Sequence, residues 1–334
     1  MLQSSVPESF IIGVDIGGTK IAAGLVDHAG QIRHQVRTPM VSADRAASGM
    51  AAVISAIDSI STKTSVGSRA HGAIRGVGIC CPGPLDPRTG VVINPPNLPC
   101  WRNFPLAAEV SQIYRVPVRV DNDANAAALA EALWGAGRGY RNVFYTTIGT
   151  GIGTGIVLDG RIYHGRTGAA AEGGHVSIDY RGPRCGCGKA GCIEVFASGP
   201  AIAKRARKRL EAAPGRSSAI FELASGDINA VTSEIVGKAF HAGDALAREI
   251  LSEAVGLLSL WLGNMVDLLE PDVIIIGGGV AMMLRPFFDD IRGRLPSCCV
   301  NSRCKEIPLL SACYGADSGI AGGAALSSYA LVKS

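Results

Sequence analysis

The chain has 334 residues, of which 47% are hydrophobic, 5% are aromatic and 43 are glycine. This length allows two domains with separate cores, and the composition is typical of α/β folds. The net charge of +4 is too small to indicate nucleic-acid binding. The longest apolar stretch, residues 255–269, is broken by Asn264 and Asp267 and is too short to span a membrane. Ser4, Pro7 and Glu8 interrupt the amino end, so we expect no signal peptide and a cytoplasmic protein with reduced cysteines.

The first predicted element is a β-hairpin. Apolar residues 10–16 and 21–26 flank a bend made of Gly17, Gly18, Thr19 and Lys20. A helix is expected over residues 50–60 and a buried strand over 74–80. The proline-rich segment 94–103, which contains Asn97, predicts a rigid loop that either carries binding groups or is a plain connection.

A short strand, residues 116–120, stops at Asp121, Asn122 and Asp123, after which residues 124–134 are rich in alanine and predict a helix. Strand-to-helix junctions are where α/β folds place reactive groups. Helix capping is the simpler explanation, but it needs only one of these polar residues. The run of three therefore favours a functional role for Asn122 and Asp123.

A second hairpin repeats the first. Residues 143–148 and 152–158 flank Gly149, Thr150 and Gly151, and Thr147 and Asp159 are twelve residues apart, as are Asp15 and Asp27. The repeat predicts two related domains. Glycine bends present backbone N–H groups without Cβ obstruction, so two of them indicate a phosphate tail held from both sides. Ordinary tight turns are the alternative.

The next segment contains a predicted metal site. His175, Cys185, Cys187 and Cys192 offer one imidazole and three thiolates, a tetrahedral Zn²⁺ set with no open position. A free reduced cluster or a disulfide is the alternative, but the glycines between the thiols favour a structural zinc knuckle. Zinc on one ring nitrogen of His175 would leave the other beside Glu172 and Glu194, an arrangement suited to hydroxyl groups.

The carboxyl half alternates helices and one strand. A basic run, residues 204–209, follows Gly199 and Pro200 and predicts the solvated face of a helix. A helix is expected over residues 244–269, then a buried strand over 273–276. This strand runs into Gly277, Gly278 and Gly279, which would let a flat ring or ribose approach the backbone. Residues 315–326 predict a closely packed final helix.

Together these motifs resemble the ROK family (repressor, open reading frame, kinase) of bacterial sugar kinases, within the actin, hexokinase and heat-shock chaperone superfamily. The resemblance spans nearly the whole chain. Matching segments are 14–20, 122–125, 149–153, 172–175, the knuckle and 277–279. One departure is Thr154, where many relatives have glycine.

The resemblance implies an α/β fold of two ribonuclease-H-like domains with the active site in the cleft between them. The small domain would comprise residues 1–122 plus 317–334, closed by the final helix, and the large domain residues 123–316 with the knuckle at 175–194. Asp123 would be the base that takes the proton from the 6-hydroxyl of a hexose. The implied sugar ligands are Asn97, Asn122, Glu172, His175 and Glu194. ATP and Mg²⁺ would be bound by Asp15, Gly17, Gly18, Thr19, Lys20, Thr147, Gly149, Thr150, Gly151, Gly277, Gly278 and Gly279.

The activity implied is ATP-dependent phosphorylation of glucose, with structural Zn²⁺, Mg²⁺ and a homodimer, and with no nucleic-acid or membrane partner. Kinases for N-acetylglucosamine or N-acetylmannosamine share nearly the same catalytic set and remain alternatives. Sugar-sensing repressors of the family carry a helix-turn-helix domain before the first glycine bend, and fourteen residues before Asp15 are too few for it. A chaperone- or actin-like ATPase does not explain the knuckle.

Overall fold

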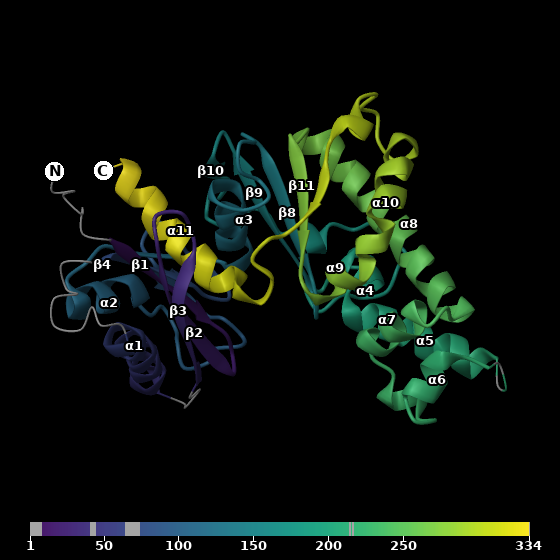
Figure 1. Cartoon of the computed structure of the whole chain (residues 1–334), viewed down its shortest axis with the longest axis horizontal. Coiled ribbons are helices and arrows are strands. Elements are labelled where there is room, and N and C mark those ends of the chain that lie inside the picture. The colour runs from purple at the N-terminus through teal and green to yellow at the C-terminus, as the bar shows by residue number, and fades with distance from the viewer. Residues whose placement is uncertain (1–8, 41–44, 64–73, 214, 216, 334) are drawn as a thin grey trace, which may run out of the picture. The chain divides into compact units, whose positions relative to one another are not determined.

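A computed structural model of the chain describes residues 9–40, 45–63, 74–213, 215 and 217–333 (Figure 1). The expectation for the amino end, which rested on Ser4, Pro7 and Glu8, lies outside these residues. By its internal contacts the chain divides into two compact units. The first comprises Met1–Arg141, Gly155–Ala171 and Ala316–Ser334, and the second comprises Asn142–Thr154 and Glu172–Gly315.

The first unit is built on a five-stranded sheet in the order β3-β2-β1-β4-β7. Its strands are β1 (Phe10–Ile16), β2 (Lys20–Val26), β3 (Ile32–Pro39), β4 (Ile74–Cys80) and β7 (Val118–Asp121). The first three strands are antiparallel neighbours, whereas β1, β4 and β7 are parallel. The other elements are α1 (Ala46–Lys63), the paired β5 (Leu85–Asp86) and β6 (Val91–Val92), α2 (Leu106–Tyr114), α3 (Asp123–Leu133) and α11 (Ser318–Lys333).

Side-chain alternation along β1 separates two layers. Ile12 and Val14 belong to the large core that also contains Val53 and Ile57 of α1. The side chains that alternate with these, including Ile11 and Asp15, face the opposite layer. There Ile11 packs with Ile320 of α11, and Asp15 lies beside the start of that helix. Because successive side chains of a strand point to opposite faces, Asp15 faces α11 as Ile11 does, whereas Ile12, Val14 and Ile16 face the other core. Figure 1 shows α11, in yellow, lying along this sheet.

A second sheet repeats the topology of the first. Its order is β10-β9-β8-β11-β12, with β8 (Val143–Ile148), β9 (Ile152–Leu158), β10 (Arg161–Ile162), β11 (Val273–Gly277) and β12 (Leu309–Ser311). In the first sheet β4 and β7 run parallel to the opening strand, β1. In the second sheet β11 and β12 likewise run parallel to the opening strand, β8. The predicted α/β fold class with a repeated hairpin is therefore confirmed.

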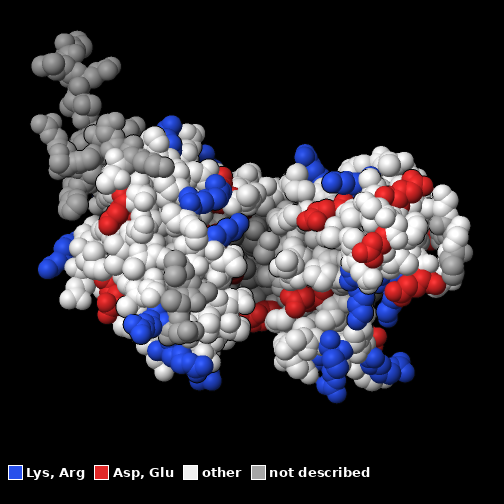
Figure 2. Space-filling model, turned by 90° about the horizontal axis from the view of Figure 1, so that it is seen from below, with Lys and Arg blue, Asp and Glu red and all other residues white. Residues whose placement is uncertain are grey.

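Helices make up most of the second unit. They are α4 (Glu194–Ala197), α5 (Gly199–Ala212), α6 (Ala219–Leu223), α7 (Ser233–His241), α8 (Ala245–Leu269), α9 (Gly279–Leu284) and α10 (Phe288–Arg294). The basic run lies on α5, where Arg205 and Arg209 pair with Glu253 of α8. Lys and Arg side chains are interspersed with Asp and Glu on the face shown in Figure 2. Among the described helices, none has the length and apolar character needed to cross a membrane.

The division into units differs from the boundary expected after Asn122. Helix α3, which begins at Asp123, lies in the first unit because it packs extensively against α11. Gly322 of α11 shows how close this packing is, since a Cβ there would lie 2.8 Å from the backbone carbonyl carbon of Ala126. Segments almost two hundred residues apart in sequence thus form one layer.

Candidate active site

Two carboxylates meet at one edge of the first sheet. Asp15 lies near the carboxyl end of β1, and Asp123 follows β7, whose direction is the same. The carboxyl ends of parallel strands are where open α/β sheets bind ligands. Burial and, second, the negative charge of Asp123 raise the pKa of Asp15 to about 6, against the opposing effects of Lys20 and Arg37. Two neighbouring carboxylates of this kind suit a hard cation such as Mg²⁺.

Asn122 and Asp123 occupy the start of α3. Asn122 caps the helix, because its Oδ1 accepts hydrogen bonds from the backbone N–H groups of Ala124 (2.9 Å) and Asn125 (3.5 Å). Asp123 Oδ1 also accepts from Ala124 N, at 2.8 Å. The Asp123 side chain is open to solvent, yet the protein atoms around it desolvate the carboxylate and raise its pKa. Capping thus accounts for Asn122 and leaves Asp123 available for chemistry.

A buried carboxylate, to which the sequence assigned no role, holds the start of α3 in place. Asp121, whose side chain is 4% exposed, accepts through Oδ1 from Asn122 N (2.7 Å) and Asn125 Nδ2 (3.1 Å). Its Oδ2 lies 2.6 Å from His164 Nε2. Asp121 is therefore fixed from three directions, and its bond to Asn122 N holds the residue that precedes the candidate base. No sequence signal marks His164, because it meets Asp121 only through the tertiary fold.

The first glycine bend lies next to the proline-rich loop. Gly17 N donates to Lys20 O at 2.9 Å, which closes the bend. A Cβ on Gly18 would lie 3.0 Å from the backbone oxygen of Asn97, so glycine allows the loop to approach closely. Thr19 and Lys20 are exposed. The structure thus brings Asn97 to the bend, as a binding role requires.

In the second unit, the bend between β8 and β9 borders a cavity of about 460 Å³. Gly149, Thr150 and Gly279 line it, together with Lys238 and His241 of α7. A Cβ on Gly149 or Gly279 would meet no atom within 4 Å, so both glycines leave open space for a ligand. The volume lies in the range typical of small-molecule sites.

Four other residues of the second unit that were expected at the nucleotide do not line this cavity: Thr147, Gly151, Gly277 and Gly278. Thr147 is half-buried within β8. A Cβ on Gly277 would lie 2.8 Å from Tyr145 Oη, and one on Gly278 would lie 2.4 Å from the Ile148 carbonyl oxygen. These two glycines therefore allow β11 and the turn that follows it to pack closely against β8. Of the triple glycine, Gly279 is the member that the structure brings to the cavity.

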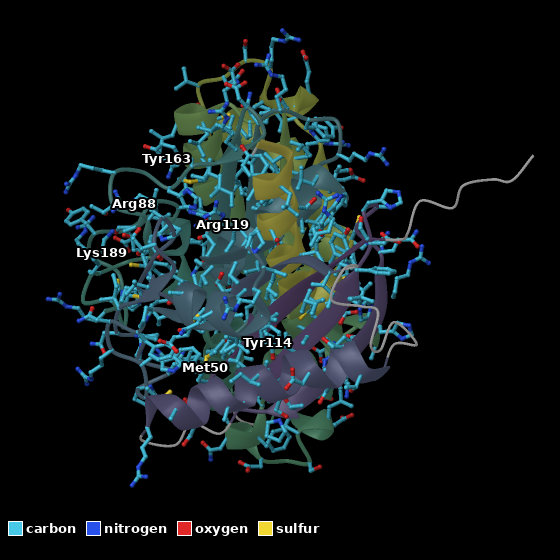
Figure 3. All side chains as sticks on the ribbon, turned by 90° about the vertical axis from the view of Figure 1, so that its left-hand side faces the viewer. Met50, Arg88, Tyr114, Arg119, Tyr163 and Lys189 are labelled. Carbon is cyan, nitrogen blue, oxygen red and sulfur yellow. The ribbon has the colours of Figure 1, made fainter. Side chains whose placement is uncertain are left out.

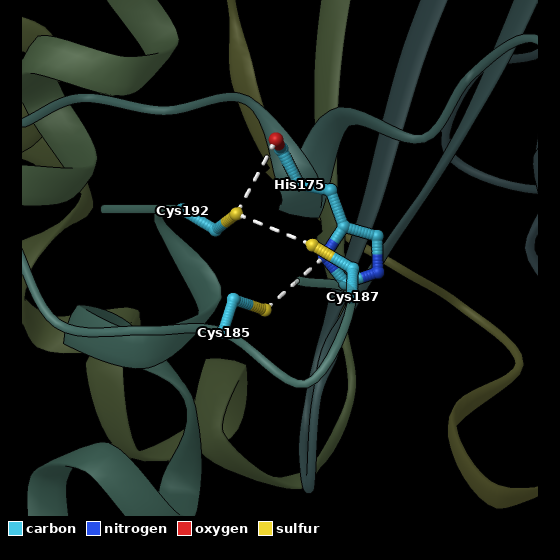
Figure 4. Close-up of side chains that lie close together, drawn as sticks. All are labelled: His175, Cys185, Cys187 and Cys192. Atoms are coloured by element: carbon cyan, nitrogen blue, oxygen red, sulfur yellow. Dashed lines mark hydrogen bonds between the residues drawn. The ribbon is translucent and has the colours of Figure 1, made fainter. Parts of the chain in front are cut away.

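The predicted zinc ligands converge on one point (Figure 4). The ligand atoms of His175, Cys185, Cys187 and Cys192 all lie within 4.8 Å of one another. His175 Nδ1 is 3.6 Å from Cys185 Sγ, and the Sγ atoms of Cys187 and Cys192 are 3.7 Å apart. A tetrahedral zinc with its usual bond lengths places nitrogen and sulfur ligands about 3.6 Å apart, and two sulfurs about 3.8 Å apart. The donor set and its spacing fit zinc, with His175 Nε2 as the ring nitrogen left over.

The turn that carries Glu172 and His175 is anchored to the strand after the second bend. A Cβ on Gly174 would lie 1.9 Å from the Ile152 carbonyl oxygen, so only glycine fits there. Gly173 N donates to Thr154 Oγ1 at 2.8 Å, and Gly173 O accepts from the indole of Trp261 at 3.0 Å. Thr154, the departure from the family pattern, thus has a positioning role that the sequence did not reveal.

Glu194 connects the knuckle to the second bend. Its Oε2 accepts from Ile152 N at 2.9 Å, and a Cβ on Gly151 would lie 2.6 Å from the same oxygen. Its Oε1 is 4.0 Å from His175 Nδ1 and 3.8 Å from Cys185 Sγ. One carboxylate therefore spans from the predicted zinc site to the predicted phosphate bend.

Comparisons with known proteins identify a family that matches nearly the whole chain. Residues 11–329 match the model of a family described as the ROK family. A glucokinase of Streptomyces coelicolor is 35% identical over 94% of this chain and 96% of that protein. The crystal structure of a ROK family glucokinase from Streptomyces griseus in complex with glucose and AMPPNP has a TM-score of 0.78, 33% identity, and coverage of 95% of this chain and 98% of that one. A xylose repressor of Caldicellulosiruptor bescii is 27% identical over 87% of this chain and 71% of that protein.

Proposed function

The chain belongs to the ROK family, and from this premise we propose that it is a glucokinase, which transfers the terminal phosphoryl group of ATP to the 6-hydroxyl of glucose. The observation that carries the proposal is Asp123, a solvent-open carboxylate at the start of α3 beside Asp15. Glucokinases that match nearly the full chain support the choice of substrate.

Asp123 acts as the general base. It accepts the proton of the sugar hydroxyl while the oxygen bonds to phosphorus, and the bond from phosphorus to the ADP oxygen breaks. Phosphoryl transfer depends more on positioning and charge neutralisation than on a strong base, so a carboxylate is sufficient. The N-terminal end of α3 favours the charged form of Asp123 through the helix dipole, which partly offsets the desolvation that raises its pKa.

The remaining residues bind and position the substrates. Asp15 would hold Mg²⁺, which neutralises phosphate charge when bound. Gly149 N donates to Gly151 O at 2.9 Å within the second bend, so the nucleotide phosphates are assigned to the backbone N–H groups of Thr150 and Gly151. The nucleoside is assigned to the adjoining cavity. Sugar hydroxyls are assigned to Asn97 and Asn122 from the first unit and to Glu172, His175 and Glu194 from the second. Zinc held by His175, Cys185, Cys187 and Cys192 would fix the imidazole ring without entering the phosphate chemistry.

A coupled assay of ATP consumption tests the proposal. Glucose, mannose, glucosamine, N-acetylglucosamine and N-acetylmannosamine are compared at equal concentrations, and glucose should give the highest kcat/KM. A preference for either N-acetylhexosamine would replace the substrate assignment with the alternative kinase. Sugar binding without ATP consumption would instead identify a sugar-sensing regulator, as the repressor relatives are named.

A matched pair of variants tests the role of Asp123. Asp123→Asn should lower kcat by about 10²–10⁴-fold with sugar binding retained. Asp289→Asn removes the same charge from the first turn of another helix, α10, and should leave kcat unchanged. Equal effects of both substitutions would show that Asp123 matters only for helix stability. The proposed homodimer is tested separately by light scattering.

A further inference from the structure

A second cavity, which none of the residues assigned to the sugar or the nucleotide lines, lies in the first unit at β7, the edge strand of its sheet. Its volume is about 380 Å³. Arg119 of β7, Arg161 of β10 and Arg88, which follows β5, line it together with apolar residues of α3 and α11 such as Leu129 and Leu326. Three guanidinium groups and an apolar surface thus share one small cavity.

Two of these positive charges are uncompensated. Arg88 donates from Nε to Asp86 at 3.1 Å, so its charge is matched by a carboxylate. The guanidinium groups of Arg119 and Arg161 are exposed and form no ion pair or hydrogen bond with any residue in the described part of the chain. Arg88 and Arg119, both labelled in Figure 3, come from separate segments of the first unit, and both line the cavity. The guanidinium group of arginine suits phosphate oxygens because it presents several N–H donors in a fixed planar arrangement.

The cavity is also connected to the start of α3. His164 and Asp121 line it, and His164 Nε2 lies 2.6 Å from Asp121 Oδ2. The other oxygen of Asp121 accepts from Asn122 N at 2.7 Å and from Asn125 Nδ2 at 3.1 Å. A charge placed in the cavity would act on His164, and therefore on the carboxylate that holds the residue before Asp123.

We propose that this cavity binds a small organic phosphate, and that the bound anion changes the positions of Asn122 and Asp123 through His164 and Asp121. Arg119 and Arg161 bind the phosphate oxygens, and the partly exposed side chains of Pro87, Ile162 and Ala330 contact the apolar body of the ligand. The volume suits one compact molecule. The binding half of the proposal is independent of the kinase assignment, whereas the coupling half rests on Asp123 as the base.

Calorimetry on the full chain tests binding, with phenyl phosphate as the probe. Glucose and AMPPNP are present at saturation, so that the proposed substrate sites are occupied. Phenyl phosphate should bind, and phenol, which lacks the charge, should not. The double variant Arg119→Ala/Arg161→Ala should weaken binding by at least about tenfold. The control Arg138→Ala removes an exposed arginine of the same unit that does not line the cavity, and should change nothing. Undetectable binding, or equal binding by the double variant, overturns the proposal.

Steady-state kinetics test the coupling. Saturating phenyl phosphate should change kcat for glucose phosphorylation in the unmodified protein and in Arg138→Ala, but not in Arg119→Ala/Arg161→Ala. His164→Gln should retain phenyl phosphate binding in the calorimeter and lose the effect on kcat. If phenyl phosphate binds as expected but kcat is unchanged, the coupling is refuted. If no sugar is phosphorylated at all, calorimetry still decides whether the cavity binds the anion.

Discussion

Replacement of Gly323 by alanine tests the packing that places Asp15. Gly323 lies within α11, where a Cβ would lie 2.5 Å from the Gly78 carbonyl oxygen and 2.9 Å from Val14 N. Both are backbone atoms of β4 and β1, so no side chain can move aside. To restore an ordinary contact of 3.4 Å, the helix would have to move by about 0.9 Å from the sheet. Such overpacking destabilises the folded state by up to about 3 kcal/mol, whereas the higher helix propensity of alanine stabilises it by about 1 kcal/mol.

We therefore expect Gly323→Ala to lower the free energy of unfolding by about 2 kcal/mol, and Tm by about 4–8 °C. Gly293 is the matched control, because it also lies in a helix, is exposed, and its Cβ would meet no atom within 4 Å. Gly293→Ala should be neutral or stabilise by up to about 1 kcal/mol. Thermal and urea unfolding, followed by circular dichroism, measure both variants. If Gly323→Ala is as stable as the unmodified protein, the close approach of α11 to the sheet is refuted.

Three further predictions concern the site. Desolvation raises the pKa of Asp123 above its ordinary 3.8, and the base must be charged, so on acidification kcat/KM for glucose should begin to fall at a pH above 3.8. The folded state holds this proton more tightly than the unfolded state, so the stability that the group contributes should increase as the pH falls and be lost as the pH rises through the folded-state pKa. Loss of activity centred near pH 3.8 would contradict the raised pKa. Purified protein should hold one zinc per chain by elemental analysis, lost in Cys185→Ser but kept in Cys298→Ser; active, folded protein without zinc would refute the knuckle. Thr154→Val should destabilise by about 1–3 kcal/mol because Gly173 N loses its buried acceptor, whereas Thr154→Ser keeps the hydroxyl and should cost less.

Features with a local sequence period were predictable. Apolar runs and paired glycine bends marked both hairpins, and ligand spacing marked the cluster of His175, Cys185, Cys187 and Cys192, because these signals depend on residues close together in the chain. The polar run after β7 likewise marked Asn122 and Asp123. What each of those two does was not decided by the sequence, since helix capping by Asn122 is visible only in the hydrogen bonds of the folded helix.

Features that depend on tertiary packing were not predictable. His164 lies 43 residues from Asp121 and carries no motif. Gly277 and Gly278 looked like ligand-binding glycines, yet they allow β11 to pack against β8, because a Cβ on either would meet Tyr145 or Ile148. The expected boundary after Asn122 divided α3 from the first unit, although α3 packs against α11, which follows nearly two hundred residues later.

Glu194 gives the knuckle a role beyond stability. A structural zinc needs only its four ligands, and a nearby glutamate carboxylate would ordinarily stay in solvent. Here one oxygen of Glu194 accepts from the backbone at the second bend and the other approaches His175, and Gly151 keeps the space that the carboxylate occupies. Removal of the metal would leave the Glu194 backbone in α4 but free the imidazole beside it. Zinc loss should therefore disturb sugar binding through His175 before it disturbs the bend, so that, as zinc is removed, KM for glucose rises at a higher remaining zinc occupancy than KM for ATP.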